Sequence, residues 1–119
     1  MAFKVWRSTQ TDEDLGLILD HLVQSYLDLG DELADAFERA IQRITAIKGD
    51  MKPLGTAAFQ GTLLPNGSPG IRRVTKHQAI FYLDVDEPKE MVRILAVFFG
   101  GQDHRRYMLK RLAARPPDA

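Results

Sequence analysis

Two groups of residues in the second half of the chain combine positive charge with groups that can transfer protons. The first group follows a glycine-rich segment and comprises Arg72, Arg73, Lys76 and His77. The second group lies near the C-terminus and comprises His104, Arg105, Arg106, Tyr107, Lys110 and Arg111. Guanidinium groups bind phosphates through paired hydrogen bonds, and a histidine or tyrosine can exchange protons with a substrate. Such a set has the chemistry to cleave RNA without a metal ion.

The same spacing also fits a structural role for these cations. Adjacent residues on a strand point to opposite faces of a sheet, so at most one of Arg72 and Arg73 belongs to any one site. Arginines also alternate outward along a strand when one face of the sheet is solvated. The residues by themselves leave both interpretations open.

Other kinds of site chemistry lack the residues that they need. The chain has no cysteine, which excludes disulfides, cysteine-based zinc sites and thiol nucleophiles. His21, His77 and His104 are too far apart in sequence for the short spacing of a metal-binding pair. Neither a phosphate-binding glycine loop nor a serine-nucleophile motif is present. We therefore predict no metal and no cofactor.

The charge of this 119-residue chain is balanced overall but divided along its length. Residues 1–50 contain ten acids and five bases, whereas residues 51–119 contain six acids and eleven bases. This asymmetry suggests an acidic or polyanionic partner on one side of the molecule. Length and composition indicate one domain over residues 1–119, without a membrane span and located in the cytoplasm.

Hydrophobic periodicity predicts a helical hairpin after a short strand at residues 3–6. Ser8, Thr9, Thr11 and Asp12 can cap the first helix, Gly30 ends it, and Asp31 can cap a second helix that ends at Gly49. The expected inward stripe of the first helix is Leu15, Ile18, Leu19, Leu22, Val23 and Tyr26. That of the second helix is Leu33, Phe37, Ala40, Ile41, Ile44 and Ile47. Helices joined so closely must pack antiparallel.

The remaining elements follow a long segment rich in glycine and proline. Residues 49–70 are expected to form an irregular loop pinned by Leu54, Phe59, Leu63 and Leu64. Strands are predicted over residues 71–75, 78–85 and 91–99, with tight turns around Lys76-His77 and residues 86–89, and a last helix over residues 102–112. The fold class is therefore α+β in the order β-α-α-β-β-β-α, an antiparallel sheet with the N-terminal helical hairpin packed on one face.

Several short motifs, in this order, resemble the RelE/ParE superfamily of toxins from bacterial type II toxin–antitoxin modules. They are Ser8-Thr9-x-x-x-x-Asp14-Leu15, Pro53-x-Gly55, Ile71-Arg72-Arg73, Ala79-Ile80-Phe81-Tyr82, Val92-Arg93-Ile94-Leu95, and the glycine corner with Asp103. The resemblance covers nearly all of residues 3–112. The apolar strand before Gly100 and Asp103 looks more like the ParE branch, also described as plasmid-stabilisation proteins, although Phe99 stands where that branch commonly has histidine.

The resemblance implies a toxin that inhibits DNA gyrase and is neutralised by a cognate antitoxin. The residues it suggests for binding the target or the antitoxin are Arg73, Lys76, Arg93, Arg105, Arg106, Lys110 and Arg111. The alternative is a RelE-like endoribonuclease that cuts mRNA on the ribosome without metal, for which the catalytic candidates are Arg72, Arg73, His104, Arg105 and Tyr107. A third possibility is an interaction module that has lost toxicity. The antitoxin groove is expected beside the hairpin and the sheet, with Arg93 or the 105–111 cluster at its rim.

Overall fold

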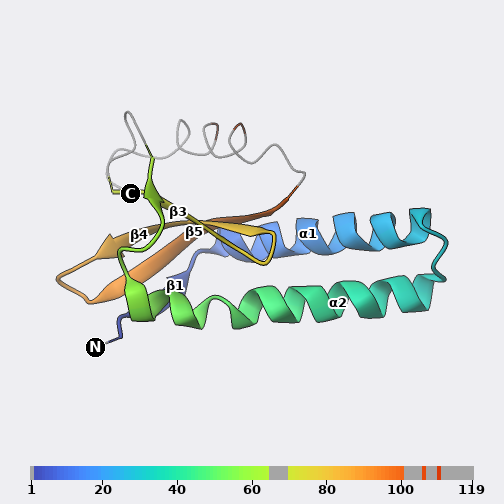
Figure 1. Cartoon of the computed structure of the whole chain (residues 1–119), viewed down its shortest axis with the longest axis horizontal. Coiled ribbons are helices and arrows are strands. Elements are labelled where there is room, and N and C mark those ends of the chain that lie inside the picture. The colour runs from blue at the N-terminus through green and yellow to red at the C-terminus, as the bar shows by residue number, and fades with distance from the viewer. Residues whose placement is uncertain (1, 65–69, 101–105, 107–109, 111–119) are drawn as a thin grey trace.

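The chain folds into two long helices and a five-stranded sheet (Figure 1). The computed structural model describes residues 2–64, 70–100, 106 and 110. In chain order the elements are β1 (Lys4–Arg7), α1 (Thr9–Asp28), α2 (Leu33–Gly49), the 3₁₀ helix η1 (Lys52–Ala57), β2 (Thr62–Leu63), β3 (Arg72–Lys76), β4 (Ala79–Asp86) and β5 (Met91–Phe99). Neither α1 nor α2 is apolar enough over its length to cross a membrane.

The sheet has the strand order β1-β5-β4-β3-β2. The predicted antiparallel meander is confirmed, because β3 pairs with β4 and β4 with β5 in antiparallel fashion. The prediction of a fully antiparallel sheet is wrong, since β1 is parallel to β5 over Lys4–Arg7. The hairpin returns the chain to the start of β1, where the Phe3 N–H donates to the Gly55 carbonyl at 2.9 Å. In the meander that follows, β4 is antiparallel to β3 and β5 is antiparallel to β4, so β5 runs in the same direction as β1.

Local capping chemistry sets the ends of the helical hairpin. Ser8 caps α1, and its Oγ accepts the Thr11 N–H at 3.1 Å. Gly30 ends the helix with φ of +103°, a backbone angle that strains any residue with a side chain. Asp31 does not cap α2 as predicted, because its N–H closes α1 on the Tyr26 carbonyl at 3.1 Å. Glu32 holds the cap position of α2 and makes no side-chain capping bond.

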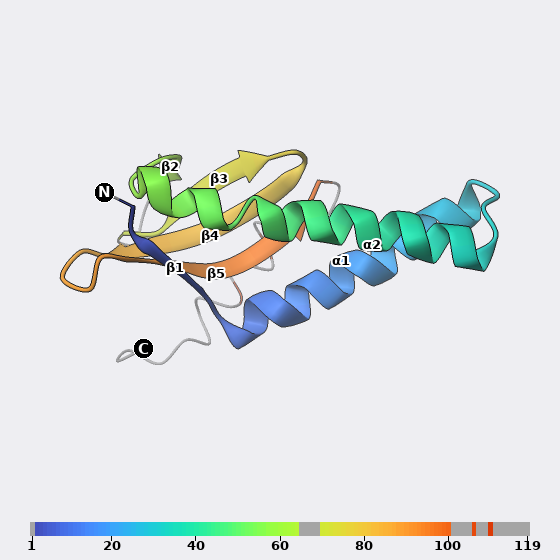
Figure 2. The same ribbon diagram turned by 90° about the horizontal axis from the view of Figure 1, so that it is seen from below.

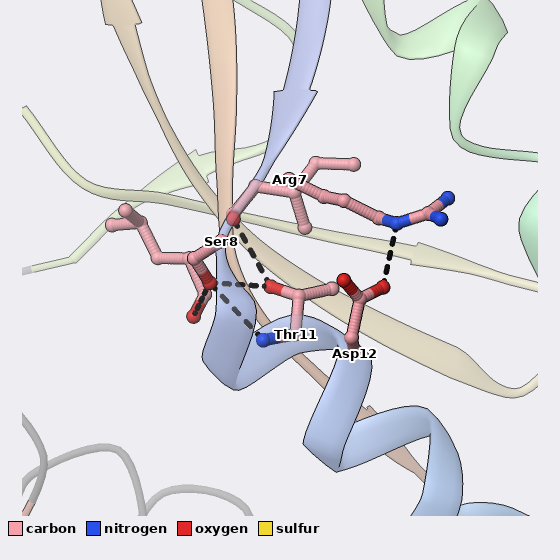
Figure 3. A network of polar contacts seen from close by, with 6 residues as sticks. Arg7, Ser8, Thr11 and Asp12 are labelled. Carbon is pink, nitrogen blue, oxygen red and sulfur yellow. Dashed lines mark hydrogen bonds and ion pairs between the residues drawn. The ribbon is translucent and has the colours of Figure 1, made fainter.

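The first turns of α1 also complete the edge of β5. Strand β1 covers β5 only as far as Ile94, so the next backbone groups of β5 need other partners. Thr11 Oγ1 donates to the Ile94 carbonyl at 3.0 Å and Ser8 Oγ to the Leu95 carbonyl at 3.2 Å (Figure 3). The buried Asp14 carboxylate accepts the Val97 N–H at 3.1 Å. These polar side chains therefore join the hairpin to the central strand.

The hairpin covers one face of the sheet, and its tip extends beyond the strands (Figure 2). The main core lies between them and includes Leu15, Ile18, Leu22, Ala40, Ile44, Ile47, Phe81, Leu83, Val92 and Ile94. This confirms the predicted stripe of α1, whose other members are partly buried against the same core. A smaller cluster of Ile71, Ile80, Tyr82, Ala96 and Phe98 lies on the other face.

The predicted inward stripe of α2 is only half right. Ala40, Ile44 and Ile47 are buried together with Ala36, which the prediction left out. Leu33, Phe37 and Ile41 are instead 65%, 48% and 39% exposed. Ala36 and Ala40 are both fully buried, so the line of small side chains faces inward and the neighbouring line of larger residues faces solvent.

The segment expected to be an irregular loop contains η1 and the short strand β2. Leu54 is fully buried, as predicted for a pinning residue. Leu63 is 51% exposed, so its predicted role is wrong, while Leu64 packs on the smaller cluster. Phe59 is also 51% exposed, but its ring packs edge-on against Phe3 with ring centroids 6.4 Å apart, so it does hold the segment to the body. The predicted last helix lies mostly outside the described residues; Arg106 and Lys110 are helical and exposed.

Candidate functional site

The cations of β3 are divided between the two faces of the sheet. Arg73 is paired in register with Tyr82, which belongs to the smaller cluster opposite the hairpin. Val74 packs in the main core, so Arg72 and Lys76, two residues away on either side, share the hairpin face. The expected alternation of Arg72 and Arg73 is therefore present. These two guanidinium groups do not converge on one phosphate-sized site.

Arg72 makes contacts within the fold. Its Nη1 donates to the Phe59 carbonyl at 2.7 Å, and its guanidinium lies 5.4 Å from the centre of the Phe59 ring. The residue thereby holds the segment between η1 and β2 against β3. This structural bond uses part of the hydrogen-bonding capacity that a phosphate ligand would need.

Arg93 forms a paired ion contact with Asp84 on the neighbouring strand. Its Nε and Nη2 donate to the two carboxylate oxygens of Asp84 at 2.7 and 2.8 Å. The hydrogen bonding of Arg93 to the Asp84 carboxylate is the main cause that raises the pKa of Arg93, so the guanidinium stays charged. Because the adjacent carboxylate neutralises this charge locally, Arg93 adds little attraction for an anion at the sheet surface.

Arg73 lies on the face opposite the hairpin, beside aromatic side chains. Tyr82 is almost fully buried and packs edge-on against Phe98, with ring centroids 5.9 Å apart. Arg73 is half-buried next to it. This face thus presents Arg73, together with the Asp84-paired Arg93 of β5, over an apolar and aromatic floor. Four predicted site residues, His104, Arg105, Tyr107 and Arg111, lie outside the described residues, so their relation to Arg73 stays a prediction.

A second group of polar residues comes together at the β3–β4 turn, which reading the sequence missed. The turn consists of His77 and Gln78, with φ of +49° and +70°, one residue later than predicted. His77 Nδ1 lies 2.9 Å from Asp50 Oδ2, and Arg43 Nη2 donates to Gln78 Oε1 at 3.1 Å. These contacts dock the turn onto α2.

A cleft of about 570 Å³ opens beside this turn. Its lining residues are His21, Leu22, Ser25, Tyr26, Arg43, His77, Gln78 and Phe99. The cleft brings together two imidazoles that are distant in sequence, so no local motif could indicate it. Arg43 also lies 5.5 Å from the centre of the Phe99 ring, next to the end of β5. In the sequence, Arg43 lies between Ala40 and Ile44, both of which are buried in α2. This position could have indicated that Arg43 is close to the sheet.

Metal chemistry finds no support among the residues that the structure describes. Within residues 2–64 and 70–100, no three histidine or acidic side chains are grouped as a metal ion would require. The contacts described for Arg72, Arg93, Arg43 and His77 hold elements of the fold together.

Comparison with known proteins identifies the fold. No protein-family model matches the sequence, and no curated protein matches it. A chain of the chromosomal ParDE toxin–antitoxin system from P. aeruginosa superposes with a TM-score of 0.61 at 24% identity, covering 83% of this chain and 97% of that chain.

Two further solved structures share the architecture. One is from the toxin–antitoxin complex RelBE2 of Mycobacterium tuberculosis, with a TM-score of 0.58 and 14% identity, covering 86% of this chain and 95% of that chain. The other is a mutant of the E. coli toxin RelE in the free state, with a TM-score of 0.55 and 10% identity, covering 93% and 98%. At these identities the similarity establishes a common fold.

Proposed function

We propose that this chain, which has the fold of the RelE/ParE superfamily, is the toxin component of a type II toxin–antitoxin module. The observation that carries the proposal is the superposition over nearly the full length of structures from ParDE and RelBE systems. The matches cover 83% and 86% of this chain, which supports the proposal of a single toxin domain over residues 1–119. The cytoplasm holds both candidate targets, and we place the protein there.

DNA gyrase is the proposed target, and inhibition by binding is the proposed mode of action. Metal-independent RNA cleavage needs cations and a proton-transfer group around one phosphate. Among the described cations, Arg72 is bonded to Phe59, Arg93 is bonded to Asp84, and Arg73 faces away from the other two cations of β3. Because these cations do not surround one phosphate, their arrangement favours inhibition by binding to a target protein over catalysis of RNA cleavage.

A RelE-like ribonuclease acting on ribosome-bound mRNA is the second candidate. It is favoured by the fold shared with RelE and by Arg73, which lies on an aromatic face of the sheet. Under this alternative Arg73, His104, Arg105 and Tyr107 would hold the phosphate and move the proton.

The two candidates are separated by assaying one purified preparation against both targets. We expect gyrase to lose supercoiling activity or to accumulate cleaved DNA, while a translation extract keeps its mRNA intact. Arg106→Ala should weaken this inhibition through lost contacts. Ribosome-dependent mRNA cuts that His104→Ala or Arg73→Ala reduces about a hundredfold would make the nuclease primary. Failure in both assays would contradict both targets.

The proposed partner is a cognate antitoxin that binds beside the hairpin and the sheet. Of the rim cations expected there, Arg106 and Lys110 are exposed, while Arg93 is paired with Asp84. Rim charges act mainly on association, so added salt should slow binding more than it speeds dissociation. Association that is indifferent to salt, measured by stopped-flow mixing, would remove the role proposed for these charges.

A further inference from the structure

A line of large apolar side chains runs along α2 without a covering element. Leu33, Phe37 and Ile41 follow one another at intervals of four residues, so they lie on one side of the helix. All three side chains are exposed. Figure 2 shows α2 at the outside of the molecule, with no other described element in front of it. Burying this line would remove apolar surface from water, which makes it a candidate contact with another molecule.

The charges of α2 are divided between its two halves. The acids come first and the bases follow, in the order Glu32 at the cap position, Asp35, Glu38, Arg39, Arg43 and Lys48. Acids at the start and bases at the end of a helix also stabilise its dipole, but that role does not account for the apolar line. A second α2 in the opposite direction would bring the acidic half of each helix to the basic half of the other. A partner with charge of one sign would match only half of this surface.

One charge at each end of the helix is available for a contact with another molecule. Glu32 is exposed and makes no side-chain capping bond. Lys48 is exposed and follows Ile41 by seven residues, two turns further along the same side of the helix. Neither Glu32 nor Lys48 has an ion-pair partner among the residues that the structure describes. Three other charged residues are bonded within the chain: Arg39 to Asp31, Arg43 to Gln78 and Asp50 to His77.

We propose that α2 pairs with α2 of a second copy of this chain, antiparallel and about a twofold axis midway between Phe37 and Ile41. In this register Phe37 of each helix meets Ile41 of the other, as an isologous interface requires. Leu33 then lies opposite Thr45, whose hydroxyl is bonded to the Ile41 carbonyl at 2.9 Å. The threonine therefore presents a methyl group without leaving a polar group unpaired.

The same register brings the charged ends of the two helices together. Lys48 of each helix falls beside residues 30–32 of the other, within reach of Glu32 through its long side chain. A contact one helix wide is smaller than a standard interface, so we expect a Kd on the order of 10 μM or weaker. Dilute samples, such as those used for denaturation, then contain the monomer. The proposal concerns α2 alone and holds whether or not the protein is a toxin.

Sedimentation equilibrium of the purified full-length protein over a range of concentrations tests the apolar contact. We expect reversible dimerisation that Phe37→Glu weakens at least about tenfold. Leu17→Glu is the matched control, because Leu17 is an exposed leucine of α1 outside the proposed interface, and it should leave the Kd unchanged. Circular dichroism of both variants checks that they are folded.

Charge reversal tests the antiparallel register. Glu32→Lys alone and Lys48→Glu alone each place like charges at both ends of the interface, so each variant should dimerise about tenfold more weakly than the wild type. An equimolar mixture of the two variants has opposite charges at both ends, and it should recover the wild-type affinity as a heterodimer. Lys89→Glu, in the exposed β4–β5 turn, is the control for a change in net charge.

A chain that stays monomeric at all concentrations would overturn the proposal. So would a dimer that persists in Phe37→Glu, or a mixture of the charge variants that associates no better than either variant alone. A chain that is monomeric by itself but binds the antitoxin through Phe37 would assign the apolar line to the antitoxin.

Discussion

Gly55 occupies a position where two backbone segments touch. A Cβ atom at this residue would lie 2.2 Å from the Phe3 carbonyl oxygen and 3.0 Å from the Val5 side chain. The same approach lets the Gly55 carbonyl accept the Phe3 N–H. Glycine is thus required here by contact between η1 and β1, and the position contributes directly to joining the N-terminal strand to the body.

Gly55→Ala is expected to lower the free energy of unfolding by about 1–3 kcal/mol, because backbone must move to accommodate the methyl group. Gly16→Ala is the matched control, since no atom lies within 4 Å of the added Cβ and the residue is inside α1. That control should raise stability by roughly 0.5–1 kcal/mol. Urea denaturation of both variants measures the difference. Equal effects would contradict the close contact.

The paired contact between Arg93 and Asp84 gives a second prediction at this scale. A double-mutant cycle of Arg93→Ala and Asp84→Ala should yield a coupling energy of about 1 kcal/mol, since the pair is only partly exposed. The raised pKa keeps Arg93 charged below its alkaline titration, so Arg93 itself should add no pH dependence near neutrality. Additive single effects would show that Arg93 is free to serve a ligand.

Reading the sequence located the cations of β3 but not their partners. The alternation of Arg72 and Arg73 follows from the two-residue period of any strand, so it was predictable. The partners of Arg72 and Arg93 come from other segments, and the sequence contains no register between segments. The grouping of His21, Arg43 and His77 escaped prediction for the same reason.

At the scale of elements, the orientation of α2 was harder to predict than its existence. Two parallel lines of apolar residues run along the helix, one through Ala36 and Ala40 and the other through Leu33 and Phe37. Hydrophobicity favours the line with larger side chains, whereas close packing of two helices favours the alanines. The choice depends on the distance between α1 and α2, which periodicity does not provide.

Substitutions on the two lines of α2 should therefore differ in effect. Ile44→Ala is expected to cost about 2–4 kcal/mol of unfolding free energy, because Ile44 is buried in the main core. Leu33→Ala should change stability by less than about 0.5 kcal/mol, because the side chain is mostly exposed. Thermal denaturation of the two variants makes the comparison. A larger loss of unfolding free energy for Leu33→Ala than for Ile44→Ala would mean that the Leu33 line, and not the Ala40–Ile44 line, faces the core.

The junction of α1 with β5 depends on polar side chains in a buried place. Thr11 is fully buried, and its hydroxyl is the described donor to the Ile94 carbonyl. Thr11→Val keeps the shape but removes the donor, and it should destabilise the protein by about 1–3 kcal/mol. Thr11→Ser keeps the hydroxyl and should cost less. The opposite order in chemical denaturation would show that the methyl group, and not the hydrogen bond, matters at this junction.

At the scale of the whole molecule, the helical hairpin and the meander of β3, β4 and β5 were predictable because each depends on local periodicity and turns, whereas the short strand β2 was not predicted. The parallel pairing of β1 with β5 was not, since either edge of a three-stranded meander can accept another strand. The acidic half of the sequence corresponds to a particular element of the fold, the helical hairpin. From residue 8 to residue 38 the chain contains acids but neither lysine nor arginine, so the hairpin is acidic along most of its length.

Growth of a bacterial host after controlled induction of this chain tests the toxin role most directly. We expect viable counts to collapse on induction and to recover when the product of the adjacent reading frame is expressed with it. Gly61→Val is a folding-defective control, since even a Cβ at this residue would lie 2.4 Å from the Arg73 carbonyl oxygen. Normal colony formation while the wild-type chain accumulates in soluble, folded form would contradict an active toxin.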